Sequence, residues 1–334
     1  MEVIVRTPAR LHLGLLDTHG GLGRLYGSIG VAVEEPNVIL EAGPADSLIV
    51  EGVETERVNL FAHRFLEKYP VLSGARIILK SSIPPHVGLG SGTQLALAVG
   101  TALARLGEVQ PPIPEIAAAM GRGIHSGIGI AAFQQGGFIL DGGHPIKKNA
   151  QSLQAVNARA IEKLPIPPVL FRYPFPEGWY FIVVVPEGRE GFSGEREHQA
   201  FQKLPDIAPA LAEKICRLVL MKMLPSLVER DIVFFGQAIT EVQRLVGDCF
   251  AVVQGGRYAY PLSEELIQFM LEKGAAGAGQ SSWGPTVYAL LEGEGHASQL
   301  LQDLQEWLAD RRGAQVYCVR ADNRGARFRQ GEQR

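Results

Sequence analysis

The segment at residues 84–94 constrains this chain most, because it places a glycine-rich turn directly before an almost wholly apolar helix. Glycines stand at positions 88, 90 and 92, and the apolar pattern predicts a helix over residues 94–106. A helix with almost no polar face must lie inside the protein. Its first N–H groups have no acceptor in the helix, and the helix dipole makes that end attractive to anions. The sequence therefore predicts a rigid, buried helix whose N-terminus binds phosphate.

The residues of this turn also have a simpler, purely structural interpretation. No Walker string of the form Gly-x-x-x-x-Gly-Lys-Ser/Thr occurs in the chain, and Thr93 stands where a dinucleotide fingerprint would have its third glycine. A tight strand-to-helix turn that needs glycine only for positive φ fits equally well. If the anion site is real, its donors are expected to be Gly88, Gly90, Ser91, Gly92, Thr93 and Gln94.

Two further glycine-rich segments supply context for the first. One covers residues 121–129 and 135–143, and the other covers residues 274–285. Together with residues 8–14 and 84–94, they resemble the motifs of the GHMP superfamily of small-molecule kinases, which includes galactokinase, homoserine kinase and mevalonate kinase. The resemblance implies an α+β fold of two domains. The first would be like ribosomal protein S5 domain 2, and the second would be a ferredoxin-like α/β sandwich.

The expected organisation along the chain follows from this resemblance. Residues 1–168 are expected to form the N-terminal domain with the phosphate loop, and residues 169–320 the C-terminal domain. Prolines at 165, 167, 168, 174 and 176 mark the connection between them. Residues 321–334 carry many arginines and polar residues, and they are expected to be a flexible tail.

One position departs from the kinase pattern. Many of these kinases have an aspartate in a Ser-Gly-Ile-Asp string, where it activates or orients the attacking hydroxyl. Here the string is Ser126-Gly127-Ile128-Gly129. Glycine accepts no proton, which predicts that the scaffold has been kept and phosphoryl transfer abandoned. Some homoserine kinases also work without the aspartate, so a small-molecule kinase remains an alternative.

A non-kinase branch matches further strings of the chain. Residues 10–17, 21–24, 126–133 and 136–144 resemble the β-ribofuranosylaminobenzene 5′-phosphate synthase family. The resemblance implies a phosphoribosyltransferase of tetrahydromethanopterin biosynthesis. Its substrates would be phosphoribosyl diphosphate and 4-aminobenzoate, or 4-hydroxybenzoate in some members, and it would release diphosphate and carbon dioxide. It also implies Mg²⁺ as cofactor and a homodimer. A catalytically silent phospholigand-binding protein is a second alternative.

The donor assignment depends on the resemblance alone, because the usual acidic motif of phosphoribosyltransferases is absent. In that motif a buried strand ends in paired acids, whereas the apolar run 179–185 ends in Pro186-Glu187. An oxocarbenium-like sugar needs a stabilised leaving diphosphate more than a strong base. The loss of the kinase aspartate is compatible with such a reaction.

Side chains near the N-terminus are the candidate catalytic residues. Strand alternation places Arg10 and His12 on one face, opposite Leu11 and Leu13, and Asp17 follows in a turn. A half-solvated strand and an Asx turn are the competing interpretations. The other candidate contacts with substrate phosphates are Arg24, Ser126, Gly127, Gly279, Ser281 and Ser282, and a magnesium ligand would be Asp17 or Asp141.

The composition limits the kinds of molecule that the protein is expected to bind and the cellular compartment in which we expect it. With 32 basic and 35 acidic residues, the net charge is −3, which gives no general attraction to nucleic acid or to an anionic membrane. The three cysteines are far apart and form no Cys-x-x-Cys pattern, and no apolar run approaches membrane-spanning length. We therefore expect a cytoplasmic enzyme of small molecules, without a motif for PLP, NAD or haem.

Overall fold

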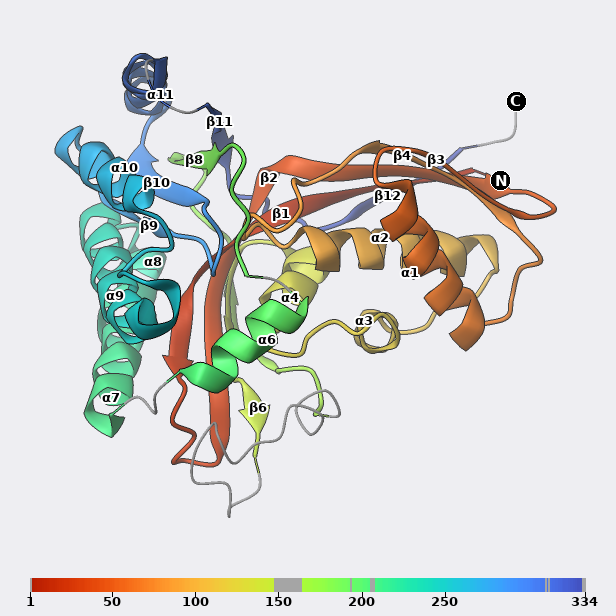
Figure 1. Ribbon diagram of the computed structural model, residues 1–334, viewed down its shortest axis with the longest axis horizontal. Helices are drawn as coiled ribbons and strands as arrows, with labels where there is room; N and C mark the ends of the chain where they lie inside the picture. The colour runs from red at the N-terminus through yellow and green to blue at the C-terminus, as the bar shows by residue number, and fades with distance from the viewer. Residues whose placement is uncertain are drawn as a thin grey trace.

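The computed structural model describes residues 2–146, 164–192, 194–204, 208–309, 311 and 313–331. Two long strands, β1 (Glu2–Asp17) and β2 (Arg24–Pro44), form the backbone of a large first sheet (Figure 1). Its central order is β12-β1-β2-β4-β3, and β5 and β6 also pair with β2, while β7 pairs with β5. The smaller strands are β3 (Leu48–Gly52), β4 (Ala75–Ser81), β5 (Phe138–Asp141), β6 (His144–Pro145), β7 (Val169–Tyr173) and β12 (Arg327–Gly331).

Helices cover one face of the first sheet (Figure 1). These are α1 (Thr55–Lys68), α2 (Ser91–Leu106), α3 (Ile113–Ala119) and α4 (Ile128–Gln135). Helix α2 lies against β1 and β2 and is flanked by α1, α3 and α4, so nearly all of its side chains are buried. The predicted burial of this helix is therefore confirmed, and its N-terminus is held in a fixed position.

A second, antiparallel sheet has the order β11-β8-β10-β9. Its strands are β8 (Trp179–Pro186), β9 (Gly277–Gln280), β10 (Val287–Glu292) and β11 (Ala314–Arg320). Every residue of β8 is buried, because Ile182 and Val184 pack in the core of α10 (Pro261–Glu272) and α11 (Glu294–Ala309), whereas Phe181 and Val183 pack in the core of α9 (Ile232–Gln254). Burial on both faces explains why the strand is apolar without alternation.

The remaining helices connect the two halves. Helix α6 (Gly194–Lys203) follows β8, and then α7 (Pro209–Leu218), the π-helix η2 (Val219–Met223) and α8 (Leu224–Glu229) lead into α9. One apolar core contains buried residues of the first sheet, of α9 and of β8, so the two sheets are not independently packed. No helix in the described part of the chain is long and apolar enough to cross a membrane.

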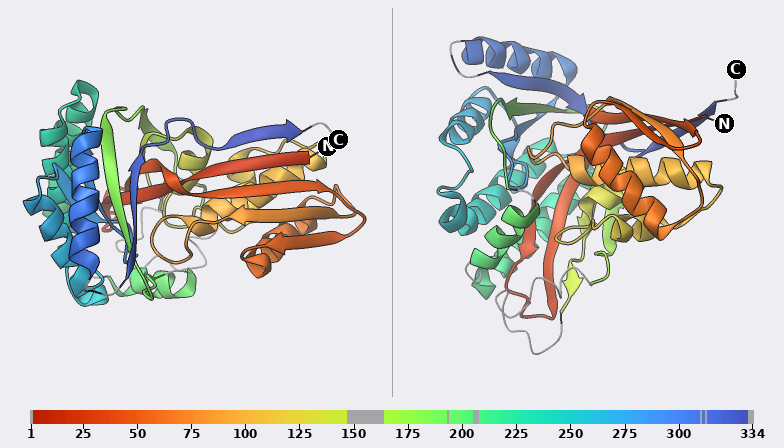
Figure 2. Two further views of the ribbon diagram at one scale, coloured as in Figure 1. Left: turned by 90° about the horizontal axis from the view of Figure 1, so that it is seen from above. Right: turned by 45° about the vertical axis from the view of Figure 1, so that its right-hand side comes forward.

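The expected two-domain α+β organisation is confirmed, but two of its boundaries differ. Strand β7 lies beyond the expected boundary at residue 168, yet it pairs with β5 in the first sheet. The expected flexible tail is also wrong for Arg327–Gly331, because these residues pair antiparallel with Glu2–Arg6 of β1 and bring the two ends of the chain side by side (Figure 2). Without β12 that edge of β1 would be unpaired, so the pairing satisfies its backbone groups.

Candidate active site

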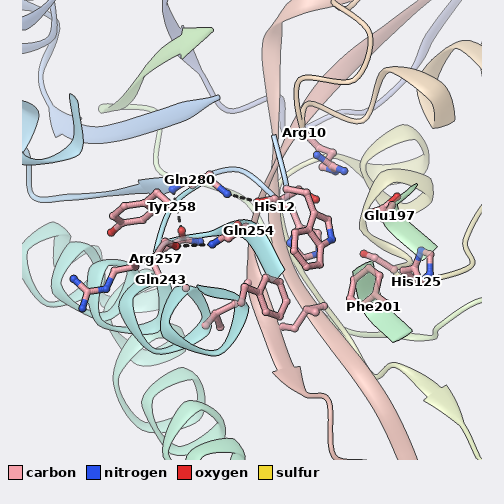
Figure 3. A pocket seen from close by; sticks show the side chains of 18 residues that line it. Arg10, His12, His125, Glu197, Phe201, Gln243, Gln254, Arg257, Tyr258 and Gln280 are labelled. Atoms are coloured by element: carbon pink, nitrogen blue, oxygen red, sulfur yellow. Dashed lines mark hydrogen bonds between the residues drawn. The ribbon is translucent and has the colours of Figure 1, made fainter. Parts of the chain in front are cut away.

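A cavity lies where β1, α6, α9 and the loop after β9 meet (Figure 3). Arg10 and His12 enter it from β1, Glu197 and Phe201 from α6, and Gln243 from α9. A second cavity shares Arg10, Glu197, His125 and Ser126 with the first and continues to Thr93 and Arg122. The shared residues make the two cavities neighbouring compartments of one site.

The N-terminus of α2 borders the second compartment. Gly90 precedes the helix with φ of 82°, and its carbonyl accepts the N–H groups of Thr93 and Gln94, both at 3.1 Å. Among the hydrogen bonds of the described residues, the N–H groups of Ser91 and Gly92 have no protein acceptor. They are therefore available to an anion, as the sequence predicted.

Three arginine side chains surround this helix end. A Cβ atom added to Gly90 would lie 3.0 Å from Cγ of Arg10, and one added to Gly92 would lie 3.0 Å from Nη1 of Arg122 and 3.6 Å from Nη2 of Arg57. Arg10 donates from Nη1 to the carbonyl of Gly88, while Arg57 pairs with Glu54. Guanidinium groups and helix N–H groups that face the same space form a binding site for a polyanion.

The pKa shifts of the arginines agree with a concentration of positive charge beside the N-terminus of α2. Burial lowers the pKa of Arg122 to about 10, and repulsion from Arg64 and Arg57 adds to this effect. Burial likewise lowers the pKa of Arg10 to about 10. Both guanidinium groups remain charged at neutral pH, and an arriving anion would offset the repulsion that Arg122 feels from Arg64 and Arg57.

Glu197 is the one carboxylate among the described residues that line these two compartments. Burial raises its pKa to about 7, although the charges of Arg10 and Arg122 oppose the rise. His12 behaves differently, because burial and the charge of Arg10 lower its pKa to about 3. At neutral pH the site therefore contains a neutral imidazole at His12 and a carboxyl group at Glu197 that exchanges its proton readily.

Aromatic side chains form one wall of the first compartment. His125 stacks on Phe201 with ring centroids 4.4 Å apart, and Phe250 stacks on Trp283 at the same separation. Phe201 meets Trp283 edge to face at 5.3 Å. All four rings line the cavity as two stacked pairs set at about a right angle to each other, and such aromatic surfaces suit a planar aromatic ligand.

The loop after β9 locks the site together through side chain to backbone hydrogen bonds. Ser281 donates from Oγ to the carbonyl of Gly88 at 2.7 Å and accepts from the N–H of His12 at 3.0 Å. Gln243 donates to the carbonyl of Leu13 at 2.6 Å and accepts from the N–H of Gln280 at 2.9 Å. The C-terminal half thus fixes both β1 and the glycine-rich turn.

The three glycines of the turn have different physical roles. A Cβ atom at Gly88 would lie 2.2 Å from the carbonyl oxygen of Ser281, so this glycine permits the third loop to pack on the turn. We expected Gly88 to admit an anion, and the structure gives it a packing role instead. Gly90 and Gly92 do border the open, arginine-lined space.

The other residues expected to contact substrate also fall into two groups, those that line a compartment and those that support its walls. Ser126 and Ser282 line the first compartment, and Thr93 lines the second. Gln94 is buried and donates to the carbonyl of Gly129 at 2.7 Å. The remaining positions support the walls, because Gly127 donates to Asp141 at 2.8 Å and a Cβ atom at Gly279 would lie 2.4 Å from Cγ of Gln243.

Asp17 and Arg24 lie outside the lining of both compartments. The carboxylate of Asp17 accepts the N–H groups of His19 and Gly20 at 2.6 and 3.1 Å, which is an Asx turn. Arg24 donates to the carbonyls of Gly142 and Gly143 at 2.5 and 2.6 Å. The structure therefore shows turn-stabilising roles for both residues and brings neither to Arg10 and His12.

The assignment of Asp141 as a magnesium ligand is corrected by the structure. Its side chain is fully buried and accepts backbone N–H groups from Ser28 at 3.0 Å, Gly127 at 2.8 Å and Gly143 at 2.9 Å. The hydroxyl of Ser126 lies 3.4 Å away. These donors occupy both oxygens, so the carboxylate holds three loop segments together.

Several residues of the site escaped prediction. Arg122 and His125 stand in a glycine-rich segment, but nothing in their spacing indicates a role. Glu197 lies in a polar helix, where an acid is ordinarily solvated, and Phe250 and Trp283 look like core residues. Only the tertiary arrangement of β1, α6, α9 and the loop after α3 brings these side chains together.

The glycine that replaces the kinase aspartate is close to the second compartment. A Cβ atom at Gly129 would lie 3.2 Å from Cγ2 of Thr93, which lines that compartment. A side chain there would therefore approach the arginine-lined space. Glycine leaves this approach without a carboxylate.

The fold and site define the class of protein, and two family models agree with it. The model described as GHMP kinases N terminal domain matches residues 56–137, and the model described as GHMP kinases C terminal matches residues 223–310. The crystal structure of homoserine kinase from Cytophaga hutchinsonii superposes with a TM-score of 0.66 at 18% identity, covering 98% of this chain and 97% of that chain. The GHMP-kinase-like fold is thereby confirmed.

Sequence relatives then give the particular branch. β-Ribofuranosylphenol 5′-phosphate synthase of Archaeoglobus fulgidus is 36% identical over 96% of this chain and 97% of its own length. The protein of the same name from Methanothermobacter thermautotrophicus is 35% identical over 87% of this chain and 89% of its own length. The chain belongs to the β-ribofuranosylphenol 5′-phosphate synthase family, a branch of the GHMP superfamily whose named members make a riboside phosphate.

Proposed function

We propose that this protein is a phosphoribosyltransferase that forms a C-riboside 5′-phosphate. Its donor would be phosphoribosyl diphosphate, its acceptor 4-hydroxybenzoate or 4-aminobenzoate, and its other products diphosphate and carbon dioxide. The observation that carries the proposal is the juxtaposition of an arginine-lined compartment with an aromatic one, joined at Arg10 and Glu197. One compartment suits a diphosphate and the other suits a benzoate ring.

The arginine-lined compartment supports the donor half of the reaction. As the anomeric carbon loses diphosphate, negative charge develops on the leaving oxygens, and fixed donors stabilise it best. The N–H groups of Ser91 and Gly92 and the guanidinium groups of Arg10 and Arg122 are such donors. The chemistry then needs no residue to activate an alcohol, which agrees with glycine at position 129.

The aromatic wall supports the acceptor half. Because Phe201 and Trp283 are perpendicular, a benzoate ring stacked on one of them would meet the edge or face of the other, which would limit its orientation. The relatives are named for a phenol product, which favours 4-hydroxybenzoate over 4-aminobenzoate. No side chain of the site identifies the ring substituent by itself.

The resemblance implies Mg²⁺ as a cofactor, but the described residues form no site that is ready to hold it. They contain no group of three or more His, Cys, Asp or Glu side chains that could hold a metal ion. Asp141 is occupied by backbone donors, and Asp17 closes a turn. Mg²⁺ would therefore have to arrive with the diphosphate of the donor.

The direct test is an assay of the purified protein with phosphoribosyl diphosphate, Mg²⁺ and each benzoate in turn. We expect stoichiometric release of carbon dioxide and diphosphate with at least one benzoate. A parallel reaction with ATP and a panel of alcohol metabolites should form no ADP. ADP formation alone would establish the kinase alternative, and binding without turnover in either assay would establish the phospholigand-binding alternative.

The biological setting is proposed on the resemblance alone. It is an early step of tetrahydromethanopterin biosynthesis, carried out in the cytoplasm by a homodimer. Neither the small-molecule site nor the balanced net charge of −3 calls for a nucleic acid or a membrane partner.

A further inference from the structure

We infer that Glu197 is the catalytic base that takes the phenolic proton of a 4-hydroxybenzoate acceptor and later returns it. This inference depends on the proposed function and assigns a residue to its chemistry. Glu197 lines both compartments, so it lies where the donor and the acceptor would meet. It is also four residues from Phe201 on α6, which places both side chains on the same face of the helix.

The reaction requires a base for a specific reason. C1 of 4-hydroxybenzoate bears the carboxylate and lies para to the hydroxyl, so it becomes a strong nucleophile when the oxygen loses its proton. As C1 bonds to the anomeric carbon, the bond from that carbon to the diphosphate oxygen breaks and its electron pair leaves with the diphosphate. The phenolic O–H pair moves into the ring, and the proton passes to Glu197.

The second half of the reaction returns the proton. The intermediate is a dienone that still carries the carboxylate on C1. The bond from C1 to the carboxylate carbon breaks, carbon dioxide leaves, and the electron pair restores the aromatic ring. The resulting phenolate takes the proton back from Glu197, so the residue ends each turnover as it began.

The other groups that face Glu197 do not suit this role. Arg10 and His12 approach from β1, Tyr26 from β2, and Arg122 from the loop after α3. The arginines are charged at neutral pH, burial keeps Tyr26 protonated by raising its pKa, and His12 is a weak base because its pKa is lowered to about 3. Arg257 and Tyr258 also line the first compartment, and burial raises the pKa of Tyr258, which keeps it protonated. His125, which stacks on Phe201, is a further titratable side chain of these walls, and the test must distinguish it.

The chemistry of the amino acceptor provides an internal control. The lone pair of 4-aminobenzoate pushes into the ring without loss of an N–H proton, and carbon dioxide release returns that pair to nitrogen. A base is therefore needed for the hydroxyl acceptor and not for the amino acceptor. A second control is 3,5-difluoro-4-hydroxybenzoate, whose more acidic phenol ionises without help.

The experiment compares wild-type protein with Glu197→Gln for these three acceptors. We expect kcat with 4-hydroxybenzoate to fall about 10²-fold or more, the usual contribution of general base catalysis, with little change for 4-aminobenzoate and partial recovery with the difluoro acceptor. The wild-type rate should rise with pH through the region near 7, where the free carboxyl group loses its proton, and the variant should lose that limb. Glu213→Gln, an exposed change on α7, is the matched control and should behave like wild type.

Three results would overturn the assignment. They are an equal loss of kcat with all three acceptors, a rise in the donor KM with kcat unchanged, and a pH limb that persists in Glu197→Gln but disappears in His125→Gln. A wild-type protein that releases no carbon dioxide with any benzoate would instead refute the proposed function. The two failures are thus distinguishable.

Discussion

Arg10 shows how much one side chain contributes to this site. Its guanidinium group donates to the carbonyl of Gly88, lies beside Gly90, and lines both compartments with Glu197. Its backbone N–H also donates to the carbonyl of Leu89 at 3.1 Å. The residue therefore ties the glycine-rich turn to β1 and supplies positive charge to the same place.

Gly90→Val should abolish binding of the donor while α2 stays folded. The new side chain would meet Arg10 at 3.0 Å or less and would adopt φ of 82°, which costs about 1–2 kcal/mol for a residue with a Cβ atom. The measurement is isothermal titration with phosphoribosyl diphosphate, with thermal unfolding in parallel. Gly293→Val is the matched control, because Gly293 has φ of 81°, precedes α11 and has nothing within 4 Å of its added Cβ atom. Equal affinity in both variants would count against the anion site.

Arg122→Gln should weaken binding of inorganic diphosphate by roughly 10-fold to 100-fold, the range expected for loss of a charged hydrogen-bonding partner. The binding constant should also become less sensitive to salt, since one cation has been removed. Titration at two salt concentrations measures both effects. Arg244→Gln on the exposed face of α9, where Arg244 pairs with Glu241, is the control that should change neither. Unaltered diphosphate binding in Arg122→Gln would place the anion elsewhere.

At the scale of elements, strand β12 has a structural role that its polar, arginine-rich sequence does not predict. Its pairing with β1 runs from Arg327 opposite Arg6 to Gly331 opposite Glu2. Phe328 meets Phe133 of α4 edge to face at 6.1 Å, and the guanidinium carbon of Arg105 of α2 lies 4.1 Å from its ring centroid. The C-terminal strand therefore fastens two helices that support the site.

Phe328→Ala should lower the free energy of unfolding by about 1–3 kcal/mol, because it removes a partly buried ring and its contact with Arg105. Chemical denaturation monitored by circular dichroism gives the change. Arg329→Ala, in the same strand with an exposed side chain, is the control and should cost much less. A Phe328→Ala protein as stable as wild type would mean that β12 is not anchored.

Asp141→Ala tests the loop junction at the end of β5. It should destabilise the protein strongly, since three buried backbone N–H groups lose their acceptor and each such group costs about 1–3 kcal/mol. The loss should be the same with and without Mg²⁺ in thermal unfolding. If Mg²⁺ stabilised wild type but not this variant, the residue would be a metal ligand after all.

At the scale of the whole molecule, the site exists because two sheets share one core. Residues of β1, α6, α9 and the loop after β9 line the first compartment, although they are far apart in the chain. Ser281 and Gln243 from the C-terminal half bond directly to residues of the first sheet. Neither half contains both the arginine-lined and the aromatic walls.

The expected homodimer can be tested through an exposed apolar surface. Five apolar side chains on η2, α8 and the start of α9 are 46–69% exposed: Leu220, Met221, Val228, Val233 and Phe234. The homodimer that the resemblance implies would bury apolar side chains of this kind, because contact with a second copy removes them from water. Light scattering after size exclusion should give a dimer for wild type and more monomer for Met221→Glu. Val53→Glu, at a similarly exposed residue after β3, should remain dimeric, and a monomeric wild type would refute the proposal.

The sequence alone determined the features that depend on residues close together in the chain. The apolar letters of residues 94–106 predict the buried helix, which the structure extends to Ser91–Leu106. The turn at residues 84–94 fits an anion site and a tight turn equally well, and only together with the other glycine-rich segments and residues 8–14 does it resemble the superfamily. The glycine at position 129 is visible in the letters and separates the chain from most kinases.

Only the tertiary structure decided which side chains share the site. Glu197 and Arg122 look like ordinary surface charges in sequence, but burial beside the site raises the pKa of Glu197 to about 7 and lowers that of Arg122 to about 10. Asp141 looks like a ligand, yet it accepts three backbone N–H groups, from Ser28 of β2, from Gly127 and from the neighbouring Gly143. Burial and electrostatic coupling depend on neighbours in space, so no local pattern records them.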